Sequence, residues 1–196
     1  MIGHIFSLYI EHHKLSNKIL IFNLPAITTC INTDMCRNTC YAIRSEKRYE
    51  AVRKSRTSNY QASIRNHFVN RMLAIIDKAI TKYAIKAVRV HESGDFYSAK
   101  YAMKWANIAR NIHKEHPEIV FYAYTKSPYR PPSDFNILES ILPNGELNYG
   151  DRNYIMKLAK KYHATICPYG LTKMKIKCGE ECSACLTKKY ILFLKH

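Results

Sequence analysis

The fold class is predicted from the stretch of residues 86–125, KAVRVHESGDFYSAKYAMKWANIARNIHKEHPEIVFYAYT. Its first residues, KAVRVH, have the alternation of a strand, and residues 98–116 repeat apolar side chains at helical spacing. A second apolar run, IVFYAYT at 119–125, follows. A strand, a helix and a strand in this order predict a βαβ unit, in which the two strands are parallel neighbours joined by a right-handed crossover.

The chain before this unit supplies a further strand and helices. Residues 18–30, KILIFNLPAITTC, are a β-rich run with a turn at Pro25. Residues 41–65 are charged and helical in tendency. Residues 68–83 place Phe68, Met72, Ile76 and other apolar residues on one stripe, so we expect this helix to pack on the sheet.

The chain after this unit is more irregular. FNILESIL, residues 135–142, predicts a short helix, and residues 151–163 predict another helix capped by Asp151. ATIC at 164–167 is expected to be the last strand. We therefore predict an α/β fold with a mainly parallel sheet, either open or curled into a partial barrel, with flanking helices and a Cys-rich tail.

The length of 196 residues predicts a single domain, 1–196, with a core at 18–167 and a Cys- and Lys-rich tail at 168–196. The N-terminus has no basic segment before its short apolar run, and no segment is long enough to span a bilayer. We therefore expect no signal peptide and no membrane association. An odd number of cysteines, seven, argues against a disulfide framework and predicts a reducing, cytoplasmic location.

Those cysteines fall into two groups, which predicts metal ligation, since scattered core thiols would not cluster. The predicted ligands are Cys30, Cys36, Cys40, Cys167, Cys178, Cys182 and Cys185. Structural zinc prefers paired C-x2-C knuckles, whereas a cubane tolerates looser spacings, so one or two [4Fe-4S] clusters are favoured over zinc. Reduced core thiols or a redox pair are the alternatives.

The tail motif C-x3-C-x2-C, formed by Cys178, Cys182 and Cys185, has the spacing of the enzymes that cleave S-adenosylmethionine with a [4Fe-4S] cluster. In those enzymes the motif follows the first strand, and an aromatic residue usually precedes its last cysteine. Here the motif lies near the C-terminus, and Ala184 takes the aromatic place. The first group follows the first strand but has C-x5-C-x3-C spacing, so only a remote relationship to those partial barrels is indicated.

Charge points to a polyanionic partner. Lys and Arg number 31 against 15 acidic residues, a formal net charge of +16. We expect nucleic acid, DNA or RNA, to be that partner. The run at 44–60 interleaves basic residues with tyrosines, and its predicted contacts are Arg44, Arg48, Arg53, Lys54 and Arg56. The alternative is an exposed basic helix without a partner.

Three residues at the carboxyl ends of strands are predicted to be catalytic. His91 and Asp95 flank a Gly-containing turn, where they could bind a ligand or move protons. Lys126 follows the next strand and could meet a phosphate or carboxylate. The alternatives are that Asp95 caps its turn or the following helix and that Lys126 is solvated.

Five stretches together, FNLPAITTC, CRNTCYA, RVHESGDFYSAKY, FYAYTKS and CGEECSACL, resemble the phage gene product 88 domain family. The resemblance covers roughly residues 18–186 and implies a small Cys-rich protein of a phage or mobile element. Where the family has a Pro-Gly-like turn after the first cysteine, this chain has Ile31 and Asn32.

Three functions follow as hypotheses. The first is an iron–sulfur protein that binds or acts on nucleic acid, with catalysis left open. The second is a zinc-stabilised nucleic-acid-binding module without catalysis. The third is a cluster-dependent redox or radical-type enzyme that acts on a small molecule.

Overall fold

The structure is a computed structural model that describes residues 8–10, 18–31, 37–38, 40–132, 135–139, 156–157, 159–160, 165–166 and 191–192. The elements in chain order are β1 (Leu8–Ile10), β2 (Ile19–Phe22), α1 (Tyr41–Arg48), α2 (Glu50–Ile64), α3 (Phe68–Tyr83), β3 (Ala87–Val90), α4 (Ala99–Glu115), β4 (Val120–Thr125), β5 (Asn136–Glu139), β6 (Thr165–Ile166) and β7 (Ile191–Leu192).

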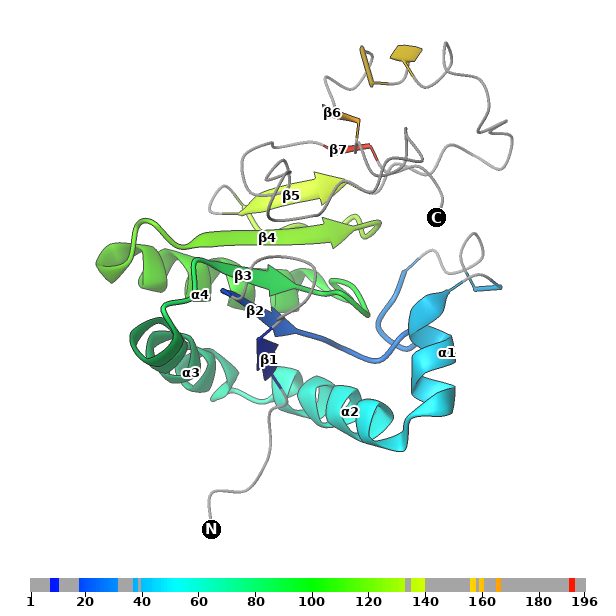
Figure 1. The fold of residues 1–196 in the computed structure, drawn as a ribbon, viewed down its shortest axis with the longest axis horizontal. Coiled ribbons are helices and arrows are strands. Elements are labelled where there is room, and N and C mark those ends of the chain that lie inside the picture. Colours follow the sequence, from blue (N-terminus) through cyan, green and yellow to red (C-terminus); the bar gives the residue numbers. More distant parts are fainter. Residues whose placement is uncertain are drawn as a thin grey trace.

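Among the described residues, the main sheet has five strands in the order β1-β2-β3-β4-β5, and β6 and β7 form a separate parallel pair. Strands β2 to β5 are parallel, with Ile21 opposite Arg89 and Arg89 opposite Tyr122 in the register. Only β1 is antiparallel, at the edge beside β2. The sheet is open (Figure 1), and the predicted α/β fold and βαβ unit at 86–125 are confirmed.

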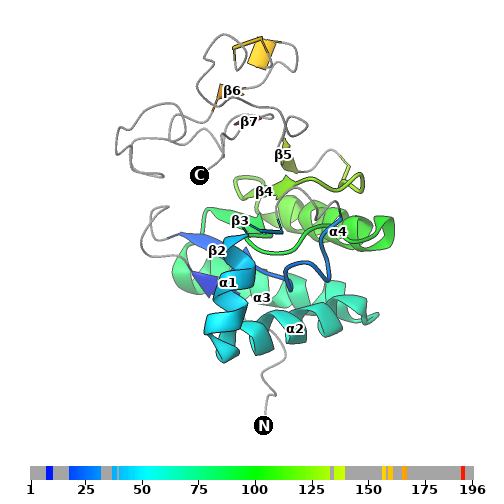
Figure 2. The ribbon, with the colours of Figure 1, turned by 90° about the vertical axis from the view of Figure 1, so that its right-hand side faces the viewer.

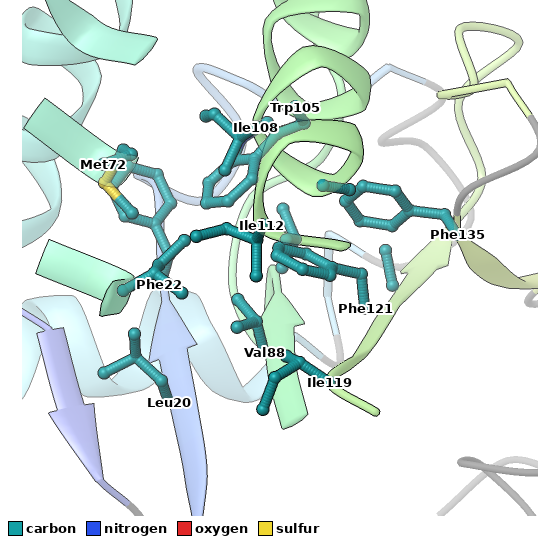
Figure 3. Packing of buried hydrophobic residues seen from close by; sticks show 14 of the residues in the cluster. Leu20, Phe22, Met72, Val88, Trp105, Ile108, Ile112, Ile119, Phe121 and Phe135 are labelled. Carbon is teal, nitrogen blue, oxygen red and sulfur yellow. The ribbon is translucent and has the colours of Figure 1, made fainter. Parts of the chain in front are cut away.

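Helices α3 and α4 cover one face of this sheet. Alternate residues of the strands, such as Phe22, Val88 and Phe121, point into a core shared with Met72 and Trp105 (Figure 3). The apolar stripe predicted for 68–83 supplies Phe68, Met72, Ile76 and Ala79 to this core, all buried. The apolar stripe of α4 is likewise buried, at Tyr101, Trp105, Ile108 and Ile112.

Helices α1 and α2 lie outside the layer that α3 and α4 form on the sheet (Figure 1). Figure 1 shows α1 beyond the carboxyl ends of β2 and β3, and Figure 2 shows it from the side of those ends. The two helices are separated at Tyr49, whose extended backbone ends α1 and begins α2. The loop between β2 and α1 carries Cys30 and Cys40, so the fold places these two cysteines at the carboxyl edge.

Three sequence predictions were wrong or incomplete. The stretch predicted as a helix at 135–142 contains β5, which pairs with β4 through Tyr122–Asn136 to Thr125–Glu139. Strand β1 was not predicted. The strand predicted as last is β6, and β7 follows it and pairs with it. The predicted Asp151 cap lies outside the described residues.

Strands β6 and β7 pair across the predicted boundary between the core at 18–167 and the tail at 168–196. The predicted boundary at 167–168 falls just after β6, yet the tail returns to pair with β6 through β7. Whether 1–196 folds as a single domain stays a prediction. None of the helices in the described part of the chain is long and apolar enough to cross a membrane.

Candidate functional site

The loops that follow β2 and β3 are joined by hydrogen bonds at the carboxyl edge of the sheet. The Asn23 Oδ1 atom accepts from the backbone N–H groups of Glu92 (2.7 Å) and Ser93 (2.9 Å). The Leu24 N–H donates to the Ser93 carbonyl, and the Ser93 hydroxyl donates to the Leu24 carbonyl, both at 2.9 Å. Because buried polar groups require partners, these bonds hold the two loops in one arrangement.

Gly94 lets these loops approach closely. Its φ of +82° is in the left-handed region, and a Cβ atom there would lie 2.6 Å from both Leu24 Cβ and Thr29 Oγ1. The Thr29 hydroxyl donates to the Pro25 carbonyl at 2.7 Å. The turn that precedes Cys30 is therefore packed against the β3 loop.

A buried ion pair fixes the same loop to the helices. The Glu46 Oε1 atom of α1 accepts from the Ala26 N–H and from Arg56 Nη1 of α2, both at 2.9 Å. Arg56 Nη1 also donates to the Ala42 carbonyl at 3.2 Å. Since Arg56 is only 7% exposed, its guanidinium binds groups inside the protein. Arg56 is thus the one predicted nucleic-acid contact that does not face solvent.

Tyr41, the first residue of α1, lies where these elements meet. Its phenol donates a hydrogen bond to the Glu92 carbonyl of the β3 loop. Desolvation raises the pKa of Tyr41, the guanidiniums of Arg89 and Arg56 lower it, and the thiols of Cys40 and Cys30 raise it further. Tyr41 therefore lies within electrostatic range of two arginines and two cysteines.

Two of the seven predicted metal ligands are described. Cys30 ends the turn after β2, Cys40 is the N-cap residue of α1, and both side chains are half-buried. The Cys40 side chain makes no capping hydrogen bond. The remaining five, Cys36, Cys167, Cys178, Cys182 and Cys185, lie outside the described residues. Within the part that is described, no three His, Cys, Asp or Glu side chains are grouped as a metal site.

His91 points into the helix-covered core. Its φ is +71°, its Nε2 atom lies 2.9 Å from the Tyr101 hydroxyl, and its ring packs edge-on to Phe96. Burial lowers the pKa of His91 to about 3, so the imidazole is neutral at physiological pH. In this position its ring belongs to the packing between β3 and α4.

Asp95 connects the ends of β3 and β4. Its Oδ1 atom accepts from the Thr125 hydroxyl (2.5 Å) and the Phe96 N–H (2.7 Å), and Oδ2 accepts from the Lys126 N–H (2.9 Å). Desolvation raises the pKa of Asp95, and these hydrogen bonds oppose the rise. This geometry fits the structural alternative, in which the carboxylate holds its turn, and catalysis by His91, Asp95 and Lys126 stays a prediction.

The basic surface predicted on the first helices is present. Arg44, Arg48, Arg53 and Lys54 are exposed along α1 and α2. The Glu50 carboxylate pairs with Lys54 at 3.0 Å and with Arg53 at 3.8 Å, and the Arg48 guanidinium lies over the Tyr49 ring at 5.3 Å. Tyr41 and Tyr49 are each about half exposed, at 52% and 51%. Cationic and aromatic groups thus share one surface next to the cysteine loop.

The sequence analysis missed two residues at this edge. Arg89 lies within the apolar strand β3, and Glu92 follows its end with a carboxylate 3.5 Å from Arg89 Nη1. The signal available was a single charged residue inside a short β-pattern, since a strand buried on both faces seldom carries an arginine.

The fold and this edge define an α/β protein with parallel strands and a cysteine-bearing loop after the first of them. The Gene product 88 family matches residues 8–149, which is more than half of the chain, and the chain belongs to this family. The resemblance predicted from the sequence motifs is therefore confirmed.

Two relatives are the Gene 88 proteins of Mycobacterium phage L5 and Mycobacterium phage D29, which are 26% and 28% identical to this chain over 102 residues. The alignments cover 48% of this chain and 41% and 40% of those proteins, so the chain spans less than half the length of the relatives it matches. No solved structure matches the chain significantly.

Proposed function

We propose that this member of a phage gene-product family binds an iron–sulfur cluster through the cysteine loop between β2 and α1, and binds nucleic acid through the adjacent surface of α1 and α2. The observation that carries the proposal is the position of Cys30, in the turn after β2, and of Cys40, at the N-terminus of α1, in one loop at the carboxyl edge of a parallel sheet. Parallel sheets of α/β proteins hold their ligands at this edge.

The residues present fit a thiolate-ligated centre. Cys30 and Cys40 are both half-buried, so neither is sealed in the core. Cys40 is the N-cap residue of α1, and the positive end of the helix dipole there favours the negative charge of a ligating thiolate. When bound, such a cluster supplies electron transfer or an open iron position. The chain itself supplies the ligands and a loop fixed by Glu46, Asn23 and Gly94.

The cluster is tested with Cys30→Ser and Cys40→Ser. We expect either change to lower the iron and acid-labile sulfide content of anaerobically purified protein, because a serine hydroxyl is a poor iron ligand. Thr28→Ala, a change at an exposed position of the same turn, is the control and should keep its iron. Unchanged iron and sulfide in both cysteine variants would remove this loop from the proposal, and zinc without sulfide would support the structural alternative.

The nucleic-acid proposal rests on the exposed residues of α1 and α2, where basic side chains lie beside Tyr41 and Tyr49. We expect the double change Arg48→Glu and Lys54→Glu to weaken binding of single-stranded DNA or RNA oligonucleotides and to flatten its salt dependence. The control is Lys78→Glu with Lys82→Glu, an equal charge change at exposed positions of α3. Fluorescence anisotropy across a salt series measures both, and equal losses in the two variants would show that net charge alone attracts the oligonucleotide.

A further inference from the structure

Arg89 is placed unusually for a charged residue. It lies in the middle of β3, between Val88 and Val90, which are both fully buried against the helices. Since side chains alternate along a strand, the Arg89 side chain leaves the sheet on the opposite face. Tyr122 and Tyr124 of β4 leave the sheet on this face too, because Phe121 and Ala123 point into the helix-covered core.

The hydrogen-bonding capacity of Arg89 is largely unused among the described residues. Its Nε atom is buried without a hydrogen-bond partner there. Its Nη1 atom lies 3.5 Å from Glu92 Oε1, longer than the 2.7–2.9 Å of a strong charge-assisted hydrogen bond. A guanidinium has five N–H groups arranged to bind an oxyanion in pairs. A buried donor without an acceptor destabilises a fold unless a ligand or water supplies one.

The surroundings favour a ligand. The guanidinium carbon lies 5.1 Å from the centre of the Tyr124 ring, so a cation–π interaction helps to position the group. The Arg89 side chain is 16% exposed, so it is not fully sealed in the interior. Arg89 lies beside Glu92, whose carbonyl accepts a hydrogen bond from Tyr41, the residue after Cys40, so the guanidinium lies near the cysteine loop.

We propose that Arg89 binds the oxyanion of a small ligand, a carboxylate or a phosphate, on the face of the sheet opposite α3 and α4, with Tyr124 as the wall of the site. The ligand accepts from the Nε and Nη groups of Arg89 and replaces the weak contact with Glu92. This site does not require a cluster in the neighbouring loop, and it differs from the exposed basic surface of α1 and α2.

The test measures binding of inorganic phosphate and of succinate to the full chain by calorimetry, at constant ionic strength. We expect wild type to bind at least one anion saturably in the millimolar range and Arg89→Met to bind it at least about tenfold more weakly. Arg110→Met, the same change at an exposed position of α4, should bind as wild type does. Phosphate alone or succinate alone as the bound anion identifies which oxyanion the site takes.

Two results would overturn the proposal. One is the lack of saturable binding of either anion to wild type, and the other is an equal loss in Arg89→Met and Arg110→Met, which would indicate a net-charge effect. Should Arg89→Met fail to fold, as judged by circular dichroism, phenylglyoxal modification of the wild-type chain replaces it. The bound anion is then expected to protect Arg89 in peptide mass spectra and to leave Arg110 reactive, and an unprotected Arg89 contradicts the site.

Discussion

Gly94 shows how one residue determines the geometry of the candidate site. Its left-handed backbone and missing side chain bring the β3 loop against Leu24 and Thr29, one residue before Cys30. The same loop carries Glu92, whose carbonyl accepts from Tyr41. The geometry of the candidate site therefore depends on a residue that has no functional group, Gly94.

We expect Gly94→Ala to lower the free energy of unfolding by about 2–4 kcal/mol, because the new Cβ is strained at positive φ and overlaps Leu24 and Thr29. Urea denaturation followed by circular dichroism measures this. Thr28→Ala in the adjoining turn is the control and should stay close to wild type. A Gly94→Ala protein within about 0.5 kcal/mol of wild type would show that the loops are not packed as described.

His91 gives a prediction for pH. Its folded-state pKa is about 3 against an ordinary value of 6.5, so between these values the unfolded chain binds a proton that the folded chain does not. The free energy of unfolding therefore has its full value, as far as His91 is concerned, above pH 6.5. It decreases as the pH falls toward 3, by at most about 1.4 kcal/mol per pH unit.

His91→Asn removes the titrating imidazole, and asparagine also tolerates the left-handed backbone at this position. We expect its free energy of unfolding to vary less between pH 6.5 and 4.5 than that of wild type, as measured by urea denaturation at each pH. Parallel pH profiles for the two proteins would mean that His91 is not buried in its neutral form.

Among the helices, the C-terminal end of α3 has a strained residue, Ala84. Ala84 closes the helix in the left-handed conformation, with φ 50° and ψ 45°, and its N–H donates to the Ile80 carbonyl at 2.9 Å. Glycine is the usual residue at this position of a helix end, because it has no Cβ to be strained.

Ala84→Gly should therefore raise the free energy of unfolding by about 0.5–1 kcal/mol. Ala74→Gly, at an exposed position inside α3, is the matched control and should lower it by about 1 kcal/mol. Thermal and urea denaturation of both variants test this opposite response. A loss of stability in both would place Ala84 in ordinary helical geometry.

Elements differ in how well their sequence predicts them. Residues 68–83 and 99–115 carry a clear helical stripe, and both form the expected helices. FNILESIL has apolar residues at helical spacing too, yet Asn136–Glu139 extends the sheet beside β4. Pairing with an existing strand edge outweighs local propensity, and a sequence read locally does not contain that edge. Strands of two or three residues, such as β1 and β7, are too short to show a period.

At the scale of the whole molecule, the order of strands and helices brought the cysteine loop and the β3 loop to one edge, as the sequence predicts for a parallel sheet. Which side chains meet there was not predictable. Asn23, Glu46 and Arg56 form their contacts over 10 to 70 residues of sequence separation. Arg56 looked like the other basic residues of its helix, and only the packing of α1 on α2 shows that it is buried.

Cluster binding is measured by the iron, zinc and acid-labile sulfide content of the wild-type chain purified without oxygen, together with its visible spectrum. We expect iron and sulfide in equal amounts, about four of each per chain for one cluster or about eight for two, with a broad visible absorption. Zinc without sulfide, or a chain without metal whose seven cysteines all titrate as free thiols, would contradict it.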